Sequence, residues 1–144
     1  MIARKKLSDK LNLALNKEID ILKSITNPNI IRFHDVQKTN SNIYLILEYC
    51  SGGDLRQYLN ERGRIEEFEV QKLIYHLSNG FKVFHERNIV HRDLKLSNLL
   101  LSSKEPNAVI KICDFGFART VLESEEAKTF CGTPPNMAPE VLSK

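Results

Sequence analysis

The sequence lacks the features that mark secreted, membrane-spanning and zinc-binding proteins. It has no apolar run long enough to span a bilayer, and its start, from Met1 to Arg4, lacks the apolar stretch of a secretory signal. It has only 3 cysteines, which are widely spaced and form no C-x-x-C pair. This pattern argues against a disulfide framework or a zinc site and favours free thiols in a reducing, cytoplasmic setting.

The charge is also too balanced to indicate a nucleic-acid partner. The 144 residues carry a formal net charge of +3, from 21 basic and 18 acidic residues, and no basic stripe with interleaved aromatics occurs. Hydrophobic residues make up 42% and charged residues 27%, which is ordinary for a globular protein of one domain at most.

Hydrophobic periodicity predicts the first elements. Leucine and isoleucine recur at helical spacing across residues 11–25, and the Asn-Pro-Asn run at 27–29 ends this predicted helix. Apolar runs at 30–33 and 43–47 predict two strands joined by a polar loop.

The second half predicts more helix and shorter strands. Gly52 and Gly53 break the chain, and Asp54 then stands at an N-cap position before a short helix ending at Leu59. The remaining predicted elements are a helix at 66–87 and strands at 99–101 and 109–112. This order predicts an α+β fold of two lobes that meet at residues 48–53.

Two short runs carry the residue types that phosphoryl transfer requires. His-Arg-Asp-Leu-Lys-Leu-Ser-Asn at 91–98 contains Asp93 as a proton acceptor and Lys95 as an ammonium for the transferred phosphate. Asn98, with Asp114 of the later Asp-Phe-Gly run, offers oxygen ligands to Mg²⁺. Any one of these residues alone would be read as a surface group. Their joint order, followed by Ala-Pro-Glu, favours a functional site.

On these residues the chain resembles the eukaryotic protein kinases over nearly its whole length. The resemblance implies a two-lobe kinase-like fold that uses ATP and Mg²⁺. It implies that Asp93 is the catalytic acid–base residue, that Asn98 and Asp114 bind metal, and that His91 braces the catalytic loop.

The resemblance extends to a subtype. Lys95, two residues after the catalytic Asp, and Thr133 in Gly-Thr-Pro are similar to serine/threonine kinases, and Thr133 is expected near Asp93. The runs 114–119 and 137–140 look most like the unc-51-like, autophagy-initiating group. Protein serines and threonines are therefore the expected acceptors.

The end of the second predicted strand resembles the hinge that binds adenine. Leu47 would be the gatekeeper, and the backbone carbonyl of Glu48 and backbone groups of Cys50 would hydrogen-bond the base. Leu100 would form the apolar floor. Asp54 would meet the ribose, although an N-cap role explains this residue equally well.

Regulation by phosphorylation is a further hypothesis. Arg92, taken as a buried guanidinium, would bind a phosphate on the activation segment through bidentate hydrogen bonds. Thr129 matches the usual phosphosite of the family, and Arg119 would be a second partner of the phosphate.

Both ends of the kinase pattern are missing from the chain. Glu18 resembles the helix carboxylate that pairs with a strand lysine, but that lysine and the Gly-x-Gly-x-x-Gly loop would precede Met1. The arginine partner of Glu140 would lie far beyond Lys144. We therefore expect a partial kinase domain: an N-lobe remnant at 1–47, a hinge at 48–53 and the first part of the C-lobe at 54–144.

The favoured function is ATP-dependent phosphorylation of protein Ser/Thr hydroxyls, with protein substrates and regulatory proteins as partners and no nucleic acid. The alternative is a truncated or pseudokinase chain that acts as a non-catalytic binding module. The isolated chain is expected to be weakly folded and catalytically poor, because faces made for absent elements would be exposed.

Overall fold

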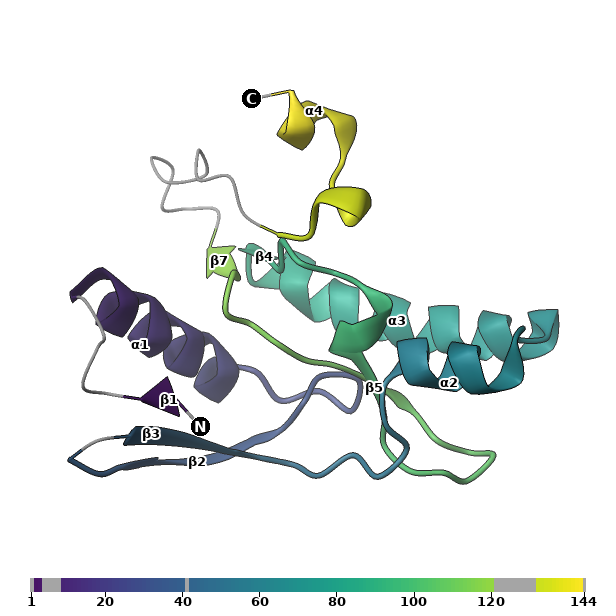
Figure 1. Cartoon of the computed structure of the whole chain (residues 1–144), viewed down its shortest axis with the longest axis horizontal. Helices are drawn as coiled ribbons and strands as arrows, with labels where there is room; N and C mark the ends of the chain where they lie inside the picture. Colours follow the sequence, from purple (N-terminus) through teal and green to yellow (C-terminus); the bar gives the residue numbers. More distant parts are fainter. Residues whose placement is uncertain (1, 4–8, 41, 121–131, 144) are drawn as a thin grey trace.

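The computed structural model describes residues 2–3, 9–40, 42–120 and 132–143. Helices and small antiparallel sheets combine in an α+β fold, as the sequence predicted (Figure 1). The helices are α1 (Asp9–Ser24), α2 (Leu55–Arg62), α3 (Glu67–Glu86) and α4 (Pro139–Leu142). The strands are β1 (Ile2–Ala3), β2 (Phe33–Lys38), β3 (Asn42–Leu47), β4 (Ile89–Val90), β5 (Leu99–Leu101), β6 (Ile110–Ile112) and β7 (Arg119–Thr120).

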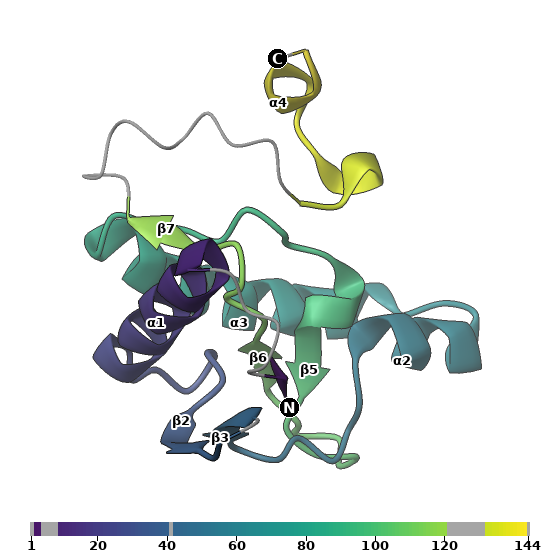
Figure 2. The same ribbon diagram turned by 60° about the vertical axis from the view of Figure 1, so that its left-hand side comes forward.

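The first part of the chain is a three-stranded sheet with one helix. β3 lies between β1 and β2 and pairs antiparallel with both. Leu15 and Ile19 of α1 are buried against Ile43 of β3, and α1 lies beside this sheet in both views (Figures 1 and 2). The helical spacing of the apolar residues in α1 is therefore the source of this packing.

The strand predicted at residues 30–33 is wrong, because β2 begins only at Phe33. The main chain before it is bonded to β6 instead. Ile31 N–H donates to Ile112 O at 2.9 Å, and Ile112 N–H donates to Asn29 O at 2.9 Å. Ile30 and Ile31 are apolar because they enter the main core, which the sequence pattern alone cannot distinguish from a sheet strand.

The main core is built around β6 and the segment that follows it. Ile110, Ile112 and Ala118 are fully buried, and Phe115 is nearly so. α3 approaches β6 closely at Gly80, where an added Cβ would lie 2.7 Å from Ile112 Cδ1. A glycine at this position in the middle of a helix is therefore explained by close packing.

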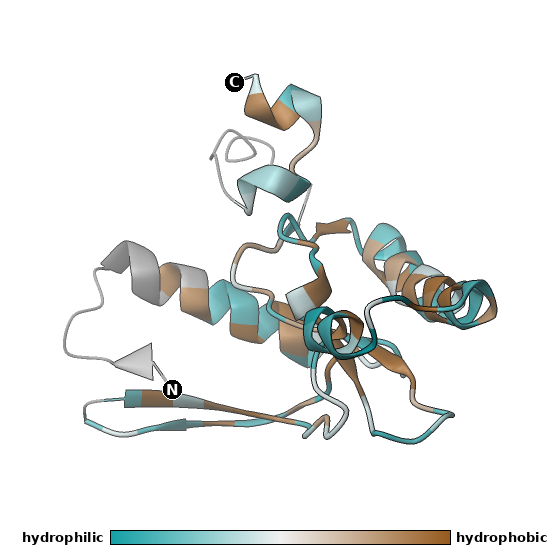
Figure 3. Ribbon diagram, turned by 45° about the vertical axis from the view of Figure 1, so that its right-hand side comes forward, coloured by the Kyte–Doolittle hydropathy of each residue, from teal (hydrophilic) through white to brown (hydrophobic). Residues whose placement is uncertain are grey.

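α3 is only partly covered. Phe84 is buried and Leu73 and Leu77 pack against the core, but Ile74 and Phe81 of the same helix are exposed. Hydrophobic segments are visible along this helix in Figure 3. Among the described residues, no helix has the length and apolar character needed to cross a membrane.

The segment between β3 and α2 is fixed to β5. Gly52 N–H donates to Leu101 O at 3.1 Å, and Leu101 N–H donates to Gly53 O at 2.8 Å. A Cβ at Gly52 would clash with Ser103 O and with Leu101, so this close approach requires glycine. The Asp54 side chain accepts a hydrogen bond from the backbone N–H of Gln57 at 2.9 Å, which makes it the N-cap of α2.

Candidate active site

Asp93 is the centre of a buried polar cluster in the loop between β4 and β5. It is 4% exposed. Its Oδ2 accepts a hydrogen bond from Lys95 Nζ at 2.8 Å, and its Oδ1 accepts one from the Thr133 hydroxyl at 2.6 Å. Lys95 Nζ also donates to Thr133 Oγ1 at 3.0 Å. Asp93, Lys95 and Thr133 therefore form a closed triangle, as the sequence predicted for the vicinity of Asp93.

The contacts of Asp93 stabilise its ionised form. Burial alone would raise the pKa of this carboxyl, but the hydrogen bonds from Lys95 and Thr133, together with the Lys95 charge, hold the pKa below its ordinary value. Asp93 is thus a carboxylate at neutral pH and can accept a proton.

Asn98 donates to the same carboxylate oxygen of Asp93 as Lys95 does. It lies in a 3₁₀ turn, Leu96–Asn98, and its Nδ2 donates to Asp93 O at 2.9 Å and to Asp93 Oδ2 at 3.3 Å. Because the amide nitrogen is used in this way, the amide oxygen of Asn98 remains available as an acceptor or ligand.

His91 connects the two motif runs. Its Nε2 lies 3.0 Å from Cys113 O, and its Nδ1 accepts a 3.4 Å hydrogen bond from Asp93 N–H. Since a carbonyl can only accept, Nε2 carries the proton in this arrangement. Burial lowers the pKa of His91 despite its bond to Cys113 and the nearby carboxylates, so the ring is neutral. The bracing role that the resemblance implied for His91 fits this geometry.

Asp114 is positioned by its neighbours in the chain. Cys113 N–H donates to Asn98 O at 2.9 Å, which fixes the strand end beside the catalytic loop. Phe115 is 1% exposed and packs edge to face on Phe84, with ring centroids 5.6 Å apart. Between these anchors Asp114 is exposed, with a positive φ of 65°. Its Oδ1 accepts a 3.4 Å hydrogen bond from Gly116 N–H.

The side chains present fit a magnesium ion shared with phosphates. Asn98 and Asp114 offer hard oxygen ligands, and their backbones are linked through the bond from Cys113 to Asn98. Mg²⁺ typically takes only one or two protein ligands and completes its shell with water and substrate phosphate.

Glu18 of α1 and Asp114 both lie close to Gly116. A Cβ added at Gly116 would be 3.4 Å from Asp114 Oδ1 and 4.0 Å from Glu18 Oε2, so the two carboxylates flank this glycine. Burial, and then the Asp114 charge, raise the pKa of Glu18.

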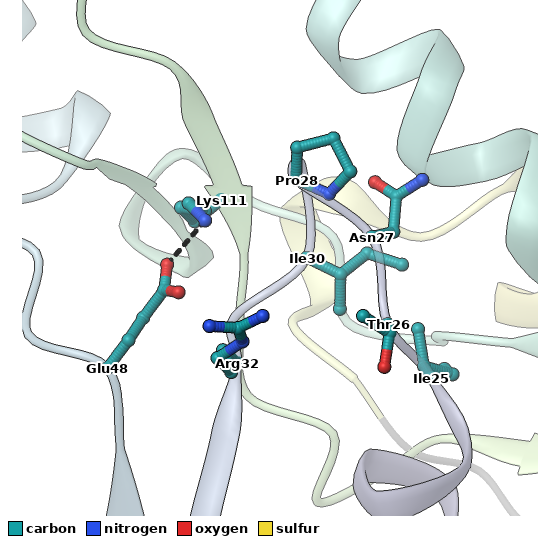
Figure 4. Close-up of a pocket in the computed structure, with 8 residues that line it drawn as sticks. All are labelled: Ile25, Thr26, Asn27, Pro28, Ile30, Arg32, Glu48 and Lys111. Atoms are coloured by element: carbon teal, nitrogen blue, oxygen red, sulfur yellow. Dashed lines mark ion pairs between the residues drawn. The ribbon is translucent and has the colours of Figure 1, made fainter.

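The predicted hinge residues follow β3. Leu47, Cys50 and Leu100 are partly buried and pack against the main core. The side chain of Glu48 turns to Lys111, and its Oε1 lies 2.6 Å from Lys111 Nζ (Figure 4). Sequence reasoning missed Lys111. The only signal was a lysine in the middle of an otherwise apolar strand, Val-Ile-Lys-Ile.

Gly132 brings the later segment onto the catalytic loop. Its φ is +112°, and an added Cβ would lie 2.5 Å from Arg92 O. Only glycine allows this approach, which places the next residue, Thr133, on Asp93.

Arg119 of β7, one of the two arginines predicted to bind a phosphate, pairs with Val90 of β4, two residues before the other, Arg92. Arg92 is half-buried rather than buried, and its Nε donates to Phe117 O at 2.6 Å. Arg119 donates from its guanidinium to Ala118 O, and Glu140 is exposed on α4. Thr129 lies outside the described residues, so the phosphosite hypothesis stays a prediction.

The two described cysteines are free thiols near the site. Burial, then the Asp114 charge, raises the pKa of Cys113 to about 12, and burial followed by the Glu48 charge raises that of Cys50. Both thiols are therefore protonated and act as packing groups.

Comparison with known proteins agrees with this arrangement. The model of the protein kinase domain matches residues 1–144. The chain belongs to the protein kinase family.

Its relatives include the kinases that the sequence resembled. It is 49% identical over 98% of its length to the serine/threonine-protein kinase ATG1a of Arabidopsis thaliana, of which it covers 22%. It is 40% identical to ULK1 of Homo sapiens and 39% identical to unc-51 of Caenorhabditis elegans, both serine/threonine-protein kinases, and covers 14% and 18% of them. The chain thus spans about a fifth of the length of these relatives.

Proposed function

We propose that this chain carries the catalytic core of a cytoplasmic, ATP- and Mg²⁺-dependent kinase that phosphorylates serine and threonine hydroxyls of proteins. One observation carries the proposal: the ionised Asp93 accepts a 2.6 Å hydrogen bond from the hydroxyl of Thr133, beside the Lys95 ammonium. A threonine hydroxyl is the acceptor group that such an enzyme would use. The serine/threonine kinases among the relatives support the same substrate class.

In the proposed reaction Asp93 takes the proton of the substrate hydroxyl. The oxygen forms a bond to the γ-phosphorus as the bond from that phosphorus to the β,γ-bridging oxygen breaks, and ADP leaves. Lys95, bonded to Asp93 at 2.8 Å, places its positive charge where the equatorial oxygens of the transferred group gain negative charge.

The remaining roles concern binding. Asn98 and Asp114 would hold Mg²⁺, which when bound neutralises charge on the phosphates. Backbone groups of Glu48 and Cys50 would hydrogen-bond adenine above Leu100. Regulation through Arg92, Arg119 and a phosphorylated Thr129 is part of the same proposal.

The test is phosphate transfer by the purified chain from labelled ATP with Mg²⁺ to a serine peptide, its threonine counterpart and its tyrosine counterpart. We expect slow transfer to serine and threonine, because the isolated chain is expected to be catalytically poor, and a further loss of about 10²- to 10⁴-fold in Asp93→Asn. Asp20→Asn, an exposed carboxylate on α1, is the matched control and should retain the wild-type rate.

Two results would contradict the proposal. Nucleotide binding without any transfer would favour the non-catalytic binding module. Transfer that Asp93→Asn leaves intact would show that another group accepts the proton.

A further inference from the structure

The ion pair between Glu48 and Lys111 joins two segments that are 63 positions apart in the sequence. Glu48 is the first residue after β3, and its backbone N–H donates to Arg32 O at 2.9 Å. Its side chain bonds to Lys111 Nζ at 2.6 Å, and the two side chains are only 20% and 13% exposed. The start of the proposed hinge is therefore held at two points, one through the backbone and one through the side chain.

This pair is a stronger contact than a surface ion pair. A short bond between an ammonium and a carboxylate is charge-assisted, and partial burial reduces its screening by salt. Removing either partner would leave the other charge half-buried and without its ion-pair partner. The Glu48 side chain therefore has a strong preference for one orientation, which restricts the peptide planes that follow it.

Lys111 lies between the segment proposed to bind the base and the proposed metal ligand Asp114. In the β5–β6 pairing it is directly opposite Leu100, the predicted adenine floor, so the two side chains project from the same face. It is the residue before Ile112, and β6 leads through Cys113 directly into Asp114. One side chain thus ties the base-binding segment to the strand that positions the metal-binding carboxylate.

A cavity behind the pair gives Glu48 an alternative position. It has a volume of about 360 Å³ and is lined by the segment after α1, by Arg32 and by the pair itself (Figure 4). Arg32 contributes a second cation to the same cavity. If the Lys111 charge were removed, the Glu48 carboxylate would have room to turn toward Arg32, and its side chain would no longer hold the start of the hinge to β6.

We propose that Lys111 is a positioning residue whose ion pair with Glu48 sets the orientation of the hinge and hence the binding of the nucleotide base. The proposal rests on the proposed function, because it concerns the same nucleotide site. It does not require Lys111 to touch the nucleotide.

The test compares Lys111→Met, which keeps the aliphatic stem and removes the charge, with Lys111→Arg and with the charge-swapped Glu48→Lys/Lys111→Glu. Lys82→Met is the matched control, because Lys82 is an exposed lysine on α3 whose contact with Glu86 is 3.9 Å long. Two quantities are measured on the whole chain. The first is backbone hydrogen exchange without nucleotide, and the second is the dissociation constant of ADP beside that of inorganic triphosphate.

We expect Lys111→Met to accelerate exchange at Glu48, Ser51 and Gly52 while α3 amides keep the wild-type rates. ADP should bind about three- to ten-fold more weakly, with triphosphate binding unchanged, and the arginine and charge-swapped variants should recover most of the loss. Lys82→Met should change neither quantity.

Other outcomes overturn the proposal in distinguishable ways. Unchanged hinge exchange and ADP binding within two-fold of wild type would mean that the pair positions nothing. Equal weakening of ADP and triphosphate, with faster exchange in α3, would mean that Lys111 only supports the fold. If wild-type chain bound no ADP, the proposed function would fail, and the exchange data would still decide whether Lys111 controls the hinge.

Discussion

Replacing Gly132 by alanine tests how the later segment reaches the catalytic loop. In the structure Gly132 has a φ of +112°, and its backbone passes so close to Arg92 that an alanine Cβ would lie 2.5 Å from the Arg92 carbonyl oxygen. The variant adds one methyl group next to Thr133 and changes no group that contacts Asp93.

The energies of holding and releasing the segment can be compared. The hydrogen bond from Thr133 to the Asp93 carboxylate is charge-assisted and contributes about 1.5–3 kcal/mol. A non-glycine residue in this region of φ costs on the order of 1–3 kcal/mol in backbone strain. The strain energy nearly cancels the energy of the hydrogen bond, and the close contact of the added Cβ with the Arg92 carbonyl oxygen is a further cost. We therefore expect Gly132→Ala to release Thr133 from Asp93.

The pKa of Asp93, followed by carbon-detected NMR of its carboxyl group, reports this release directly. The Thr133 hydroxyl is one of the groups that lower this pKa, so Gly132→Ala should raise it, and Thr133→Val should raise it to a similar extent. Phosphate transfer, where the wild type shows it, should fall in both variants.

Gly63→Ala is the matched control for the strain. Gly63 also has a positive φ, +75°, but nothing lies within 4 Å of an added Cβ. This variant should lose stability and leave the pKa of Asp93 unchanged. If Gly132→Ala also left that pKa at its wild-type value, the close contact between Gly132 and Arg92 would not be what positions Thr133 on Asp93.

Three further changes test the fold around the site. Gly80→Ala should lower the free energy of unfolding, measured in urea, by about 1–3 kcal/mol minus the gain in helix propensity, because the added methyl would lie 2.7 Å from the buried Ile112. The control Ser78→Ala, at an exposed position of the same helix, should not destabilise the protein. Asp54→Ala should cost about 0.5–2 kcal/mol in the same assay by removing the N-cap, and Asp54→Asn should cost little. Burial lowers the pKa of His91 from 6.5, so as the pH drops below about 6.5 the unfolded chain takes up a proton before the folded one does, and the free energy of unfolding should fall. His91→Gln should make the free energy of unfolding depend less steeply on pH. An unchanged dependence would contradict a neutral His91.

Local chemistry made the helices predictable. α1 was expected at 11–25 and spans Asp9–Ser24, and α3 was expected at 66–87 and spans Glu67–Glu86. The side chain of Asp54 caps α2 as its position before a helix indicated. Periodicity and capping act within a few residues, so the sequence carries them directly.

Contacts between distant segments were not predictable in the same way. The apolar run at 30–33 indicated a strand, but the backbone partner of Ile31 is Ile112, 81 positions later. The partner of a lone lysine such as Lys111 cannot be predicted from a strand pattern either. For Asp93, Lys95 and Asn98 the short spacing within one loop made the proximity predictable. The position of Thr133 near Asp93 was expected from the family resemblance, but the close approach of Gly132 to Arg92 that produces it was not.

Backbone strain occurs beside both carboxylates that carry the proposed chemistry. Arg92, directly before Asp93, and Asp114 itself both have a φ of 65°, which costs a non-glycine residue on the order of 1–3 kcal/mol. Both positions are held by bonds from neighbouring groups: Arg92 donates to Phe117 O at 2.6 Å, and Cys113 is bonded to both Asn98 and His91.

These bonds connect the two strained positions to each other. Arg92 reaches the segment after Asp114, and His91 and Asn98 reach the residue before it, so neither loop can relax its backbone without breaking contacts to the other. The carboxylates of Asp93 and Asp114 are therefore held in position by a shared network, and removing His91 should disturb both. Hydrogen exchange in His91→Gln should accordingly accelerate at Asp93 and at Cys113 together; acceleration at only one of them would mean that the two loops are held independently.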